Sequence, residues 1–182
     1  MIRLACKIPN KVILACSGGR DSMSALEFLL KGKRDVELAY FNHKTQHSEE
    51  AEGFVSQIAE QLGLTYYIGF PIDKKAKKES DEAYWHRERH SFFKRFETPV
   101  VLAHHLSDAA EWWVFSSFRG NPSLMPIRKP KTKIIRPFLL SKQSDLHRFD
   151  KYSHIEDPSN ATTKYARNFI RKEIMPLSLI HI

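Results

Sequence analysis

The sequence is poor in cysteine, which excludes one class of site. Only Cys6 and Cys16 occur among its 182 residues, and no C-x-x-C pair is present. A zinc or iron–sulfur site built on cysteine is therefore not expected. Both cysteines fall in apolar segments, so we expect reduced thiols in the core rather than a disulfide.

Long apolar runs are also lacking. No stretch approaches the ~18 residues that a membrane span needs, and residues 1–10 lack the apolar core of a signal peptide. We expect a cytoplasmic protein that does not bind membranes. With 42% hydrophobic residues, the chain can bury one domain with a small addition, but not two catalytic domains.

Acidic residues are outnumbered by basic ones. The chain has 29 Lys and Arg against 21 Asp and Glu, a net charge of +8. The basic residues gather in five segments, at residues 31–34, 74–78, 87–95, 128–133 and 164–172. One such segment is typical of a solvated face, but five together favour a polyanionic partner, and nucleic acid is the simplest.

A glycine loop at residues 17–22 carries the strongest signal. It reads Ser-Gly-Gly-Arg-Asp-Ser, follows an apolar run and precedes a helical pattern. It lacks the lysine of G-x-x-x-x-G-K-[ST] and does not fit G-x-G-x-x-G. A strand, a glycine turn and a helix start present N–H groups to an anion, although a simple capped turn would also use these residue types. The loop resembles the pyrophosphate loop of the ATP pyrophosphatases, and this resemblance implies that it binds the phosphates of ATP, with these residues as ligands: Ser17, Gly18, Gly19, Arg20, Asp21 and Ser22. Asp21 is the candidate Mg²⁺ ligand.

The pattern of apolar residues predicts an α/β fold. Strands are expected at residues 11–16, 36–42, 64–70 and 99–103, and helices at residues 22–30, 48–62, 79–96 and 106–118. This alternation predicts a doubly wound, mostly parallel sheet, whose strand ends form the binding edge. This rule brings Asn42, His43 and His104 to the edge that holds the glycine loop, and the resemblance to the ATP pyrophosphatases implies that they are further ATP ligands.

After residue 120 the character of the sequence changes. Three prolines precede a short apolar run at residues 134–135 and a fourth follows it, which indicates a loop around the edge of the domain. Helices are expected at residues 141–152 and 163–175. We therefore divide the chain into an ATP-binding α/β domain, residues 1–125, and a connecting loop with a small C-terminal helical appendage that completes the site, residues 126–182.

Two further constellations could carry chemistry. Asp108 and Glu111 lie three residues apart near the start of a predicted helix, where they could hold Mg²⁺, orient an ammonium group, or merely complement the helix dipole. Arg167 and Arg171 share one face of a predicted helix. Such a face could bind phosphates or could equally be exposed to solvent. Trp112 and Trp113 are expected to pack rather than to stack on bases.

The motifs together resemble the tRNA(Ile)-lysidine synthetase family. They are S-G-G-R-D-S, F-N-H at residues 41–43, A-H-H-L-S-D-A-A-E at residues 103–111, R-G at residues 119–120, I-R-P at residues 135–137, and E-D-P-S-N with Y-A-R-N-F-I-R within residues 156–171. The first motif is shared by the PP-loop superfamily of N-type ATP pyrophosphatases, with its adenine nucleotide α-hydrolase-like fold. The last two motifs are more selective, and the match covers the catalytic portion of the family.

This resemblance implies a two-step reaction on a tRNA. ATP adenylates the wobble cytidine of an isoleucine tRNA with a CAU anticodon, and free lysine then displaces AMP to give lysidine, AMP and pyrophosphate. ATP and Mg²⁺ are the implied cofactors, and a homodimer is left open. Asp21, Asp108, Glu111 and Arg167 would be catalytic. The implied tRNA contacts are Arg89, Arg119, Lys164, Arg167 and Arg171.

The sequence departs from the family pattern at a few positions. Ser107 stands where an aspartate is usual and Trp112 where a threonine is usual, while His86 and His90 align with an arginine and a tyrosine. Two alternatives stay open: another PP-loop tRNA-modifying enzyme, such as a thiolase, and an RNA-binding relative without catalysis.

Overall fold

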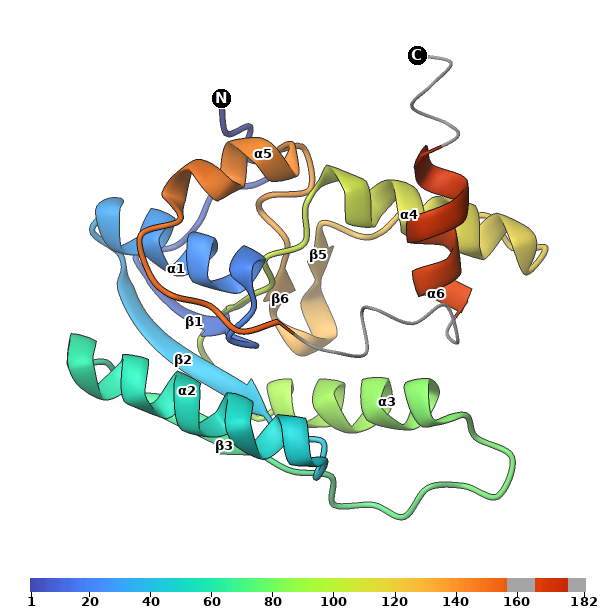
Figure 1. Ribbon diagram of the computed structural model, residues 1–182, viewed down its shortest axis with the longest axis horizontal. Helices are drawn as coiled ribbons and strands as arrows, with labels where there is room; N and C mark the ends of the chain where they lie inside the picture. The colour runs from blue at the N-terminus through green and yellow to red at the C-terminus, as the bar shows by residue number, and fades with distance from the viewer. Residues whose placement is uncertain (157–165, 177–182) are drawn as a thin grey trace.

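A six-stranded sheet organises the molecule, which we describe from a computed structural model over residues 1–156 and 166–176 (Figure 1). The strand order is β3-β2-β1-β4-β6-β5. All neighbours are parallel except β5 and β6. The strands are β1 (Lys11–Ala15), β2 (Asp35–Phe41), β3 (Tyr66–Gly69), β4 (Val100–Val101), β5 (Arg128–Lys129) and β6 (Ile134–Ile135). The predicted doubly wound, mostly parallel α/β fold is thereby confirmed.

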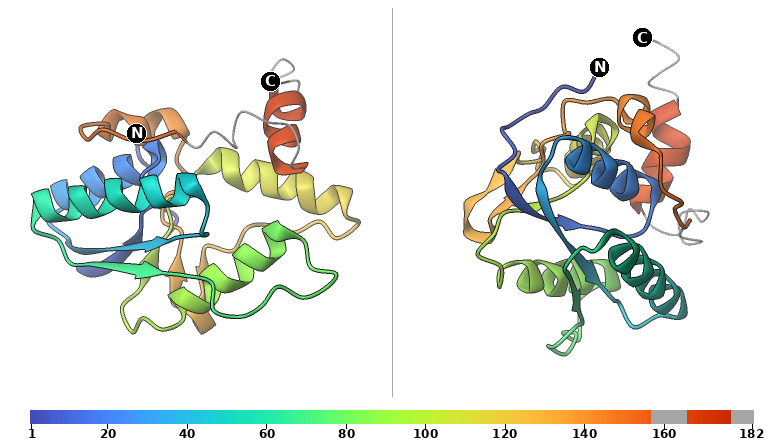
Figure 2. Two further views of the ribbon diagram at one scale, coloured as in Figure 1. Left: turned by 60° about the horizontal axis from the view of Figure 1, so that its bottom comes forward. Right: turned by 90° about the vertical axis from the view of Figure 1, so that its left-hand side faces the viewer.

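Helices cover both faces of this sheet (Figure 2). The longer ones are α1 (Arg20–Lys31), α2 (Gln46–Leu62), α3 (Asp81–Phe93) and α4 (Leu106–Phe118). Shorter helical pieces are η1 (Pro130–Thr132), α5 (Gln143–Leu146), η2 (His147–Phe149), α6 (Ala166–Phe169) and the π-helical turn η4 (Ile170–Ile174). The pair α6 and η4 lies against α4, which projects from the end of the sheet.

Alternation along β1 explains which helices cover which face. Val12 and Leu14 point to the side of α1 and α2, where they join a core that includes Leu26. Ile13 points to the other side, where it packs with Phe92 from α3. Successive strand residues face opposite ways, so one apolar run serves two cores.

Local signals set the ends of the helices. The side chain of Thr45 accepts a hydrogen bond from the Ser48 N–H at the start of α2, and Ser80 does the same for Ala83 at the start of α3. Gly63 ends α2 with a left-handed φ of 63°. Hydroxyl N-caps and a glycine C-cap satisfy backbone groups that the helix leaves without partners.

The prediction of a plain loop after residue 120 was wrong. Strands β5 and β6 come from this segment, and β6 extends the sheet beside β4. Each has only two residues, too short to show a period, and β5 consists of Arg128 and Lys129. The predicted helix at residues 141–152 is also shorter, because α5 passes into the 3₁₀ turn η2.

The remaining expectations concern the termini and membranes. Residues 163–165 of the last predicted helix lie outside the described part of the chain. In that part, every helix is too short or too polar to cross a bilayer. Cys6 and Cys16 are both free thiols, and Cys16 is buried in the core.

Candidate functional site

The glycine loop follows β1 and requires glycine at its first turn. Gly18 has a φ of +77°, and a Cβ there would lie 3.0 Å from side-chain atoms of both Ile155 and Phe54. The Ile155 N–H donates to the Gly18 carbonyl at 2.9 Å. Ile155 thus packs the segment after η2 onto the loop at a point where only glycine fits.

Helix α1 begins at the end of this loop without a side-chain cap. Gly19 is its N-cap residue and provides no side-chain cap, and the Gly19 N–H donates to the Ser17 hydroxyl at 3.4 Å. The Ser22 hydroxyl donates to the Gly19 carbonyl at 2.8 Å and lies 3.3 Å from the Ser17 hydroxyl. An uncapped helix start beside two hydroxyls offers donors and a positive dipole end to an anion.

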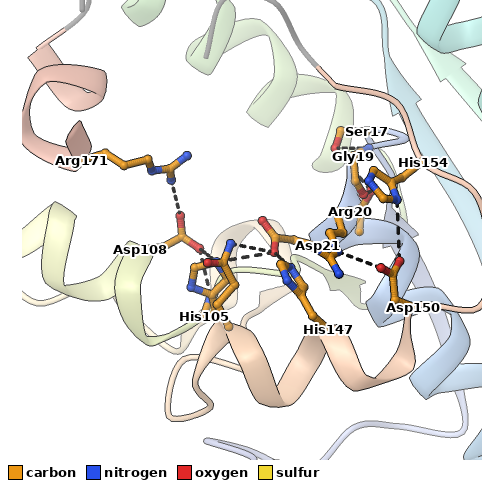
Figure 3. A network of polar contacts seen from close by, with 12 residues as sticks. Ser17, Gly19, Arg20, Asp21, His105, Asp108, His147, Asp150, His154 and Arg171 are labelled. Carbon is orange, nitrogen blue, oxygen red and sulfur yellow. Dashed lines mark hydrogen bonds and ion pairs between the residues drawn. The ribbon is translucent and has the colours of Figure 1, made fainter. Parts of the chain in front are cut away.

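Asp21 lies at the centre of a polar network (Figure 3). Its Oδ1 is 2.7 Å from His147 Nε2 and 3.6 Å from His105 Nε2, and it accepts a hydrogen bond from Gln143 Nε2 at 3.2 Å. Burial alone would raise the pKa of Asp21, but the two histidines and Gln143 outweigh it and lower the pKa well below its usual range. Asp21 is therefore a carboxylate at neutral pH.

A magnesium ion would fit beside Asp21. Among residues 1–156 and 166–176, no group of three His, Cys, Asp or Glu side chains could hold a metal by itself. Mg²⁺ commonly uses one or two carboxylates and completes its shell with phosphates and water. One carboxylate next to a phosphate-binding loop meets that requirement.

Asp108 and Glu111 face Arg171 from the first turns of α4. Arg171 donates through Nε and Nη2 to the two carboxylate oxygens of Glu111, at 2.7 and 2.9 Å, and through Nη2 to Asp108 Oδ1 at 3.3 Å. Asp108 and Glu111 are 6% and 2% exposed. The spacing of three residues thus buries two carboxylates that hold one cation.

His105 joins this pair to Asp21. Its ring Nε2 is 3.5 Å from Asp108 and 3.6 Å from Asp21, and its backbone N–H donates to Asp108 Oδ2 at 2.9 Å. Burial lowers the pKa of His105, but the two flanking carboxylates outweigh it and raise the pKa. The network runs from the glycine loop through His105 to α4 (Figure 3).

Asp21, Asp108, Gln143 and Arg171 line one cleft of about 1020 Å³. A second pocket of about 270 Å³ adjoins it, lined by Glu111 and by aromatic residues including Trp85, Trp112 and Phe115. His43, His86, Arg89 and Trp112 line both cavities.

Most predicted site residues come together here. The cleft is lined by Ser17, Gly19, Arg20, Asp21, Ser22, His43, Arg89, His104, Asp108 and Arg171. Arg20 also donates to Asp150 Oδ2 at 2.8 Å. The fold thus brings the glycine loop and Asp108 of the carboxylate pair to the same cleft.

Other predicted residues lie elsewhere. Asn42 is buried and uses its side chain locally, donating to Glu52 and accepting from the Lys44 N–H, both at 2.6 Å. Arg119 ends α4 and lies over the Phe115 ring. Lys164 and the side chain of Arg167 lie outside the described part of the chain.

The structure corrects one expectation and adds residues that the sequence did not suggest. Trp112 and Trp113 were expected in packing but are 37% and 51% exposed, since α4 projects from the sheet. His147 reaches Asp21 from η2, and Gln143 reaches it from α5. No motif marks them, because they meet the loop only through the fold.

Comparison with known proteins identifies a family that matches this chain and relatives that resemble it in sequence. The family described as PP-loop domain matches residues 3–178. The chain is 30% identical to a tRNA(Ile)-lysidine synthase from Francisella philomiragia subsp. philomiragia over 93% of this chain and 46% of that protein. It is 32% identical to one from Streptococcus gordonii over 92% and 41%. The chain therefore spans less than half the length of these relatives.

A solved structure has a similar fold. The predicted subunit of tRNA methyltransferase from Methanocaldococcus jannaschii superposes with a TM-score of 0.51 at 14% identity, covering 90% of this chain and 88% of that one. This likeness concerns the fold.

Proposed function

This chain belongs to the PP-loop family, and we propose that it is the catalytic part of a tRNA-modifying ligase of the lysidine synthetase type. In this proposal, ATP activates the wobble cytidine of an isoleucine tRNA with a CAU anticodon. Free lysine then attacks the activated ring to give lysidine, AMP and pyrophosphate. The enzyme would act in the cytoplasm.

One observation carries the proposal. The uncapped start of α1 and the buried carboxylates of Asp108 and Glu111 meet at one cleft system, linked through His105. An anion site and a cation site so close together suit a reaction between a nucleotide and an amine. The sequence identity of 30% and 32% to two tRNA(Ile)-lysidine synthases supports an isoleucine tRNA and lysine as the substrates.

The first step uses the glycine loop. The pyrophosphate part of ATP would lie against the first-turn N–H groups of α1 and the hydroxyls of Ser17 and Ser22. Mg²⁺ held by Asp21 would neutralise charge on the leaving pyrophosphate. The carbonyl oxygen of the cytosine attacks the α-phosphorus, the α–β phosphoanhydride bond breaks and pyrophosphate leaves. The carbonyl oxygen, a poor leaving group, is thereby converted into part of AMP, a good one.

The second step uses the carboxylate pair. The ε-ammonium of lysine would bind at Glu111, with its alkyl chain against Trp85, Trp112 and Phe115 of the adjoining pocket. One proton must leave before attack, and the carboxylates of Glu111 and Asp108 can accept it. The amine nitrogen then bonds to the ring carbon, and AMP departs with the electron pair of the broken C–O bond.

Arg171 fixes these carboxylates while no substrate is bound. Its guanidinium spans Glu111 and Asp108, so an entering ammonium would share or replace these contacts. Arg171 and Arg89 would also contact tRNA phosphates, and Arg167, Arg119 and Lys164 would extend that contact. A division into residues 1–125 and 126–182 and a homodimer stay predictions.

The direct test is incorporation of labelled lysine into tRNA with ATP and Mg²⁺. We expect label in tRNA and one AMP released per lysine joined, and Asp21→Ala should abolish both. Absence of label with ATP untouched would refute the proposal. Mass spectrometry of the nucleosides would reveal a thiolated product instead.

A further inference from the structure

The cleft has a basic end, formed by His86, Arg89 and His90 of α3, Lys129 of β5, and Arg136 directly after β6. It lies away from the glycine loop in the fold, because β6 is two strands from β1 in the sheet order. The proposed reaction gives it no role beyond a general tRNA contact at Arg89.

Arg136 is a buried cation with neutral partners. It is 4% exposed, and it donates through Nε to His104 Nδ1 at 3.1 Å and through Nη1 to the Pro126 carbonyl at 2.8 Å. Within residues 1–156 and 166–176, no carboxylate pairs with the guanidinium of Arg136 or with the ammonium of Lys129. Buried charges are normally balanced, since an isolated one is costly.

The neighbours of Arg136 increase the positive charge. Burial, together with Arg89, Lys129 and Arg136, lowers the pKa of His86 to about 4. Burial and the same three residues, with His86, lower the pKa of His90 to about 3. The rings of His86 and His90 lie 4.2 Å apart, centre to centre. Arg136 and Lys129, beside two histidines whose protonation is disfavoured, therefore suit a ligand that brings negative charge.

We propose that the basic end binds a phosphodiester group of the RNA substrate, next to the nucleotide being modified. This inference rests on the proposed function, because it assumes an RNA in the cleft. The glycine loop already offers a site for the phosphates of ATP, whereas a polynucleotide brings further phosphates beyond the reacting base. Arg89 and Lys129 are half-buried, so they can meet a ligand from the cleft. Guanidinium groups suit phosphate oxygens.

The test compares two variants that lose the same charge. In the site variant, Arg89→Gln and Lys129→Gln remove two cations from the basic end and leave the buried Arg136 in place. In the control, Arg128→Gln and Lys131→Gln remove two exposed cations that flank Lys129 but line neither cavity. Affinity is measured by fluorescence anisotropy for a labelled anticodon stem-loop RNA over a salt series, and separately for ATP.

We expect the site variant to bind the RNA about tenfold more weakly. Its slope of log affinity against log salt should fall by ~0.7 for each lost contact, as for single strands. The control should change affinity less than about twofold, and both should bind ATP like the parent chain. Equal RNA affinity in the two variants would overturn the proposal. If the site variant loses affinity for ATP but not for the RNA, the basic end binds a phosphate of the nucleotide and the proposal is wrong.

These results are separable from the fate of the proposed function. If the parent chain joins no lysine to tRNA but the site variant still loses RNA affinity selectively, the ligase proposal fails and the phosphate site stands. If lysine is joined while both variants bind RNA equally, the phosphate site fails and the ligase proposal stands.

Discussion

At the scale of single residues, the glycine loop depends on Gly18. Gly18→Ala would place a methyl group 3.0 Å from Ile155 and Phe54 at a φ of +77°. We expect about 1–3 kcal/mol of lost unfolding free energy and weaker ATP binding, measured by urea denaturation and by calorimetry.

A matched control for that variant is Gly53→Ala in α2. A Cβ at Gly53 would meet nothing within 4 Å, and Gly53 lies inside a helix. This change should stabilise the protein by up to ~1 kcal/mol through helix propensity. Equal stability and ATP affinity of the two variants would contradict the packing that we describe for Gly18.

Glu111 should act in the step that uses lysine. Glu111→Gln removes the charge that faces Arg171, and a cation bound there loses a charge-assisted hydrogen bond. We expect kcat/KM for lysine to fall by roughly 100-fold, about 2.7 kcal/mol, while the activation step persists, measured as tRNA-dependent release of pyrophosphate from ATP without lysine. Glu60→Gln on the exposed face of α2 serves as the control. An unchanged kcat/KM for lysine would exclude Glu111 from this role.

The site was predictable from sequence only where neighbours in sequence are also neighbours in space. The glycine loop and the spacing of Asp108 and Glu111 act within one turn, so their pattern is visible. His147 lies 126 residues from Asp21, and the two meet at 2.7 Å. Only the return of η2 to the loop brings them together, and no local pattern encodes that return.

At the scale of elements, β3 and α3 pack through Gly69. A Cβ at this position would lie 2.5 Å from Phe92 Cγ. Gly69→Ala should therefore cost about 1–3 kcal/mol of unfolding free energy by overpacking. Adding Phe92→Leu should recover part of the loss, and urea denaturation of the single and double variants measures this coupling. Strictly additive effects would show that α3 does not contact Gly69.

Long elements were predictable and short ones were not. Helix α4 was expected at residues 106–118 and has those bounds, because many residues carry its pattern. Strands β5 and β6 contain two residues each, and their pairing depends on β4 rather than on their own sequence. Tertiary context decides such strands.

At the scale of the whole molecule, stability should depend on His86 and His90. Their pKa values of about 4 and about 3 in the folded chain lie below the ordinary 6.5. The unfolded chain therefore takes up protons first as the pH falls, so this contribution to stability is present above about pH 6.5 and is lost toward pH 4.

The double variant His86→Gln, His90→Gln should lose less stability over that range. Urea midpoints between pH 7 and pH 4.5 measure the effect, and His47→Gln on α2 provides a histidine control. His86 is partly exposed, so solvent screening reduces its share. If the stability of the double variant fell with pH as steeply as that of the parent chain, the two rings would not be surrounded by positive charge.

In the proposed function, the cleft and the pocket that adjoins it join ATP activation to lysine transfer. Mass spectrometry of the nucleosides from tRNA incubated with protein, ATP, Mg²⁺ and lysine tests it directly. We predict that the wobble cytidine gains the mass of lysine less one water with the parent chain, gains nothing with Asp21→Ala, and gains this mass about 100-fold more slowly with Glu111→Gln at limiting lysine. Unmodified cytidine with the folded parent chain, or modification with either variant at the rate of the parent chain, would contradict the account.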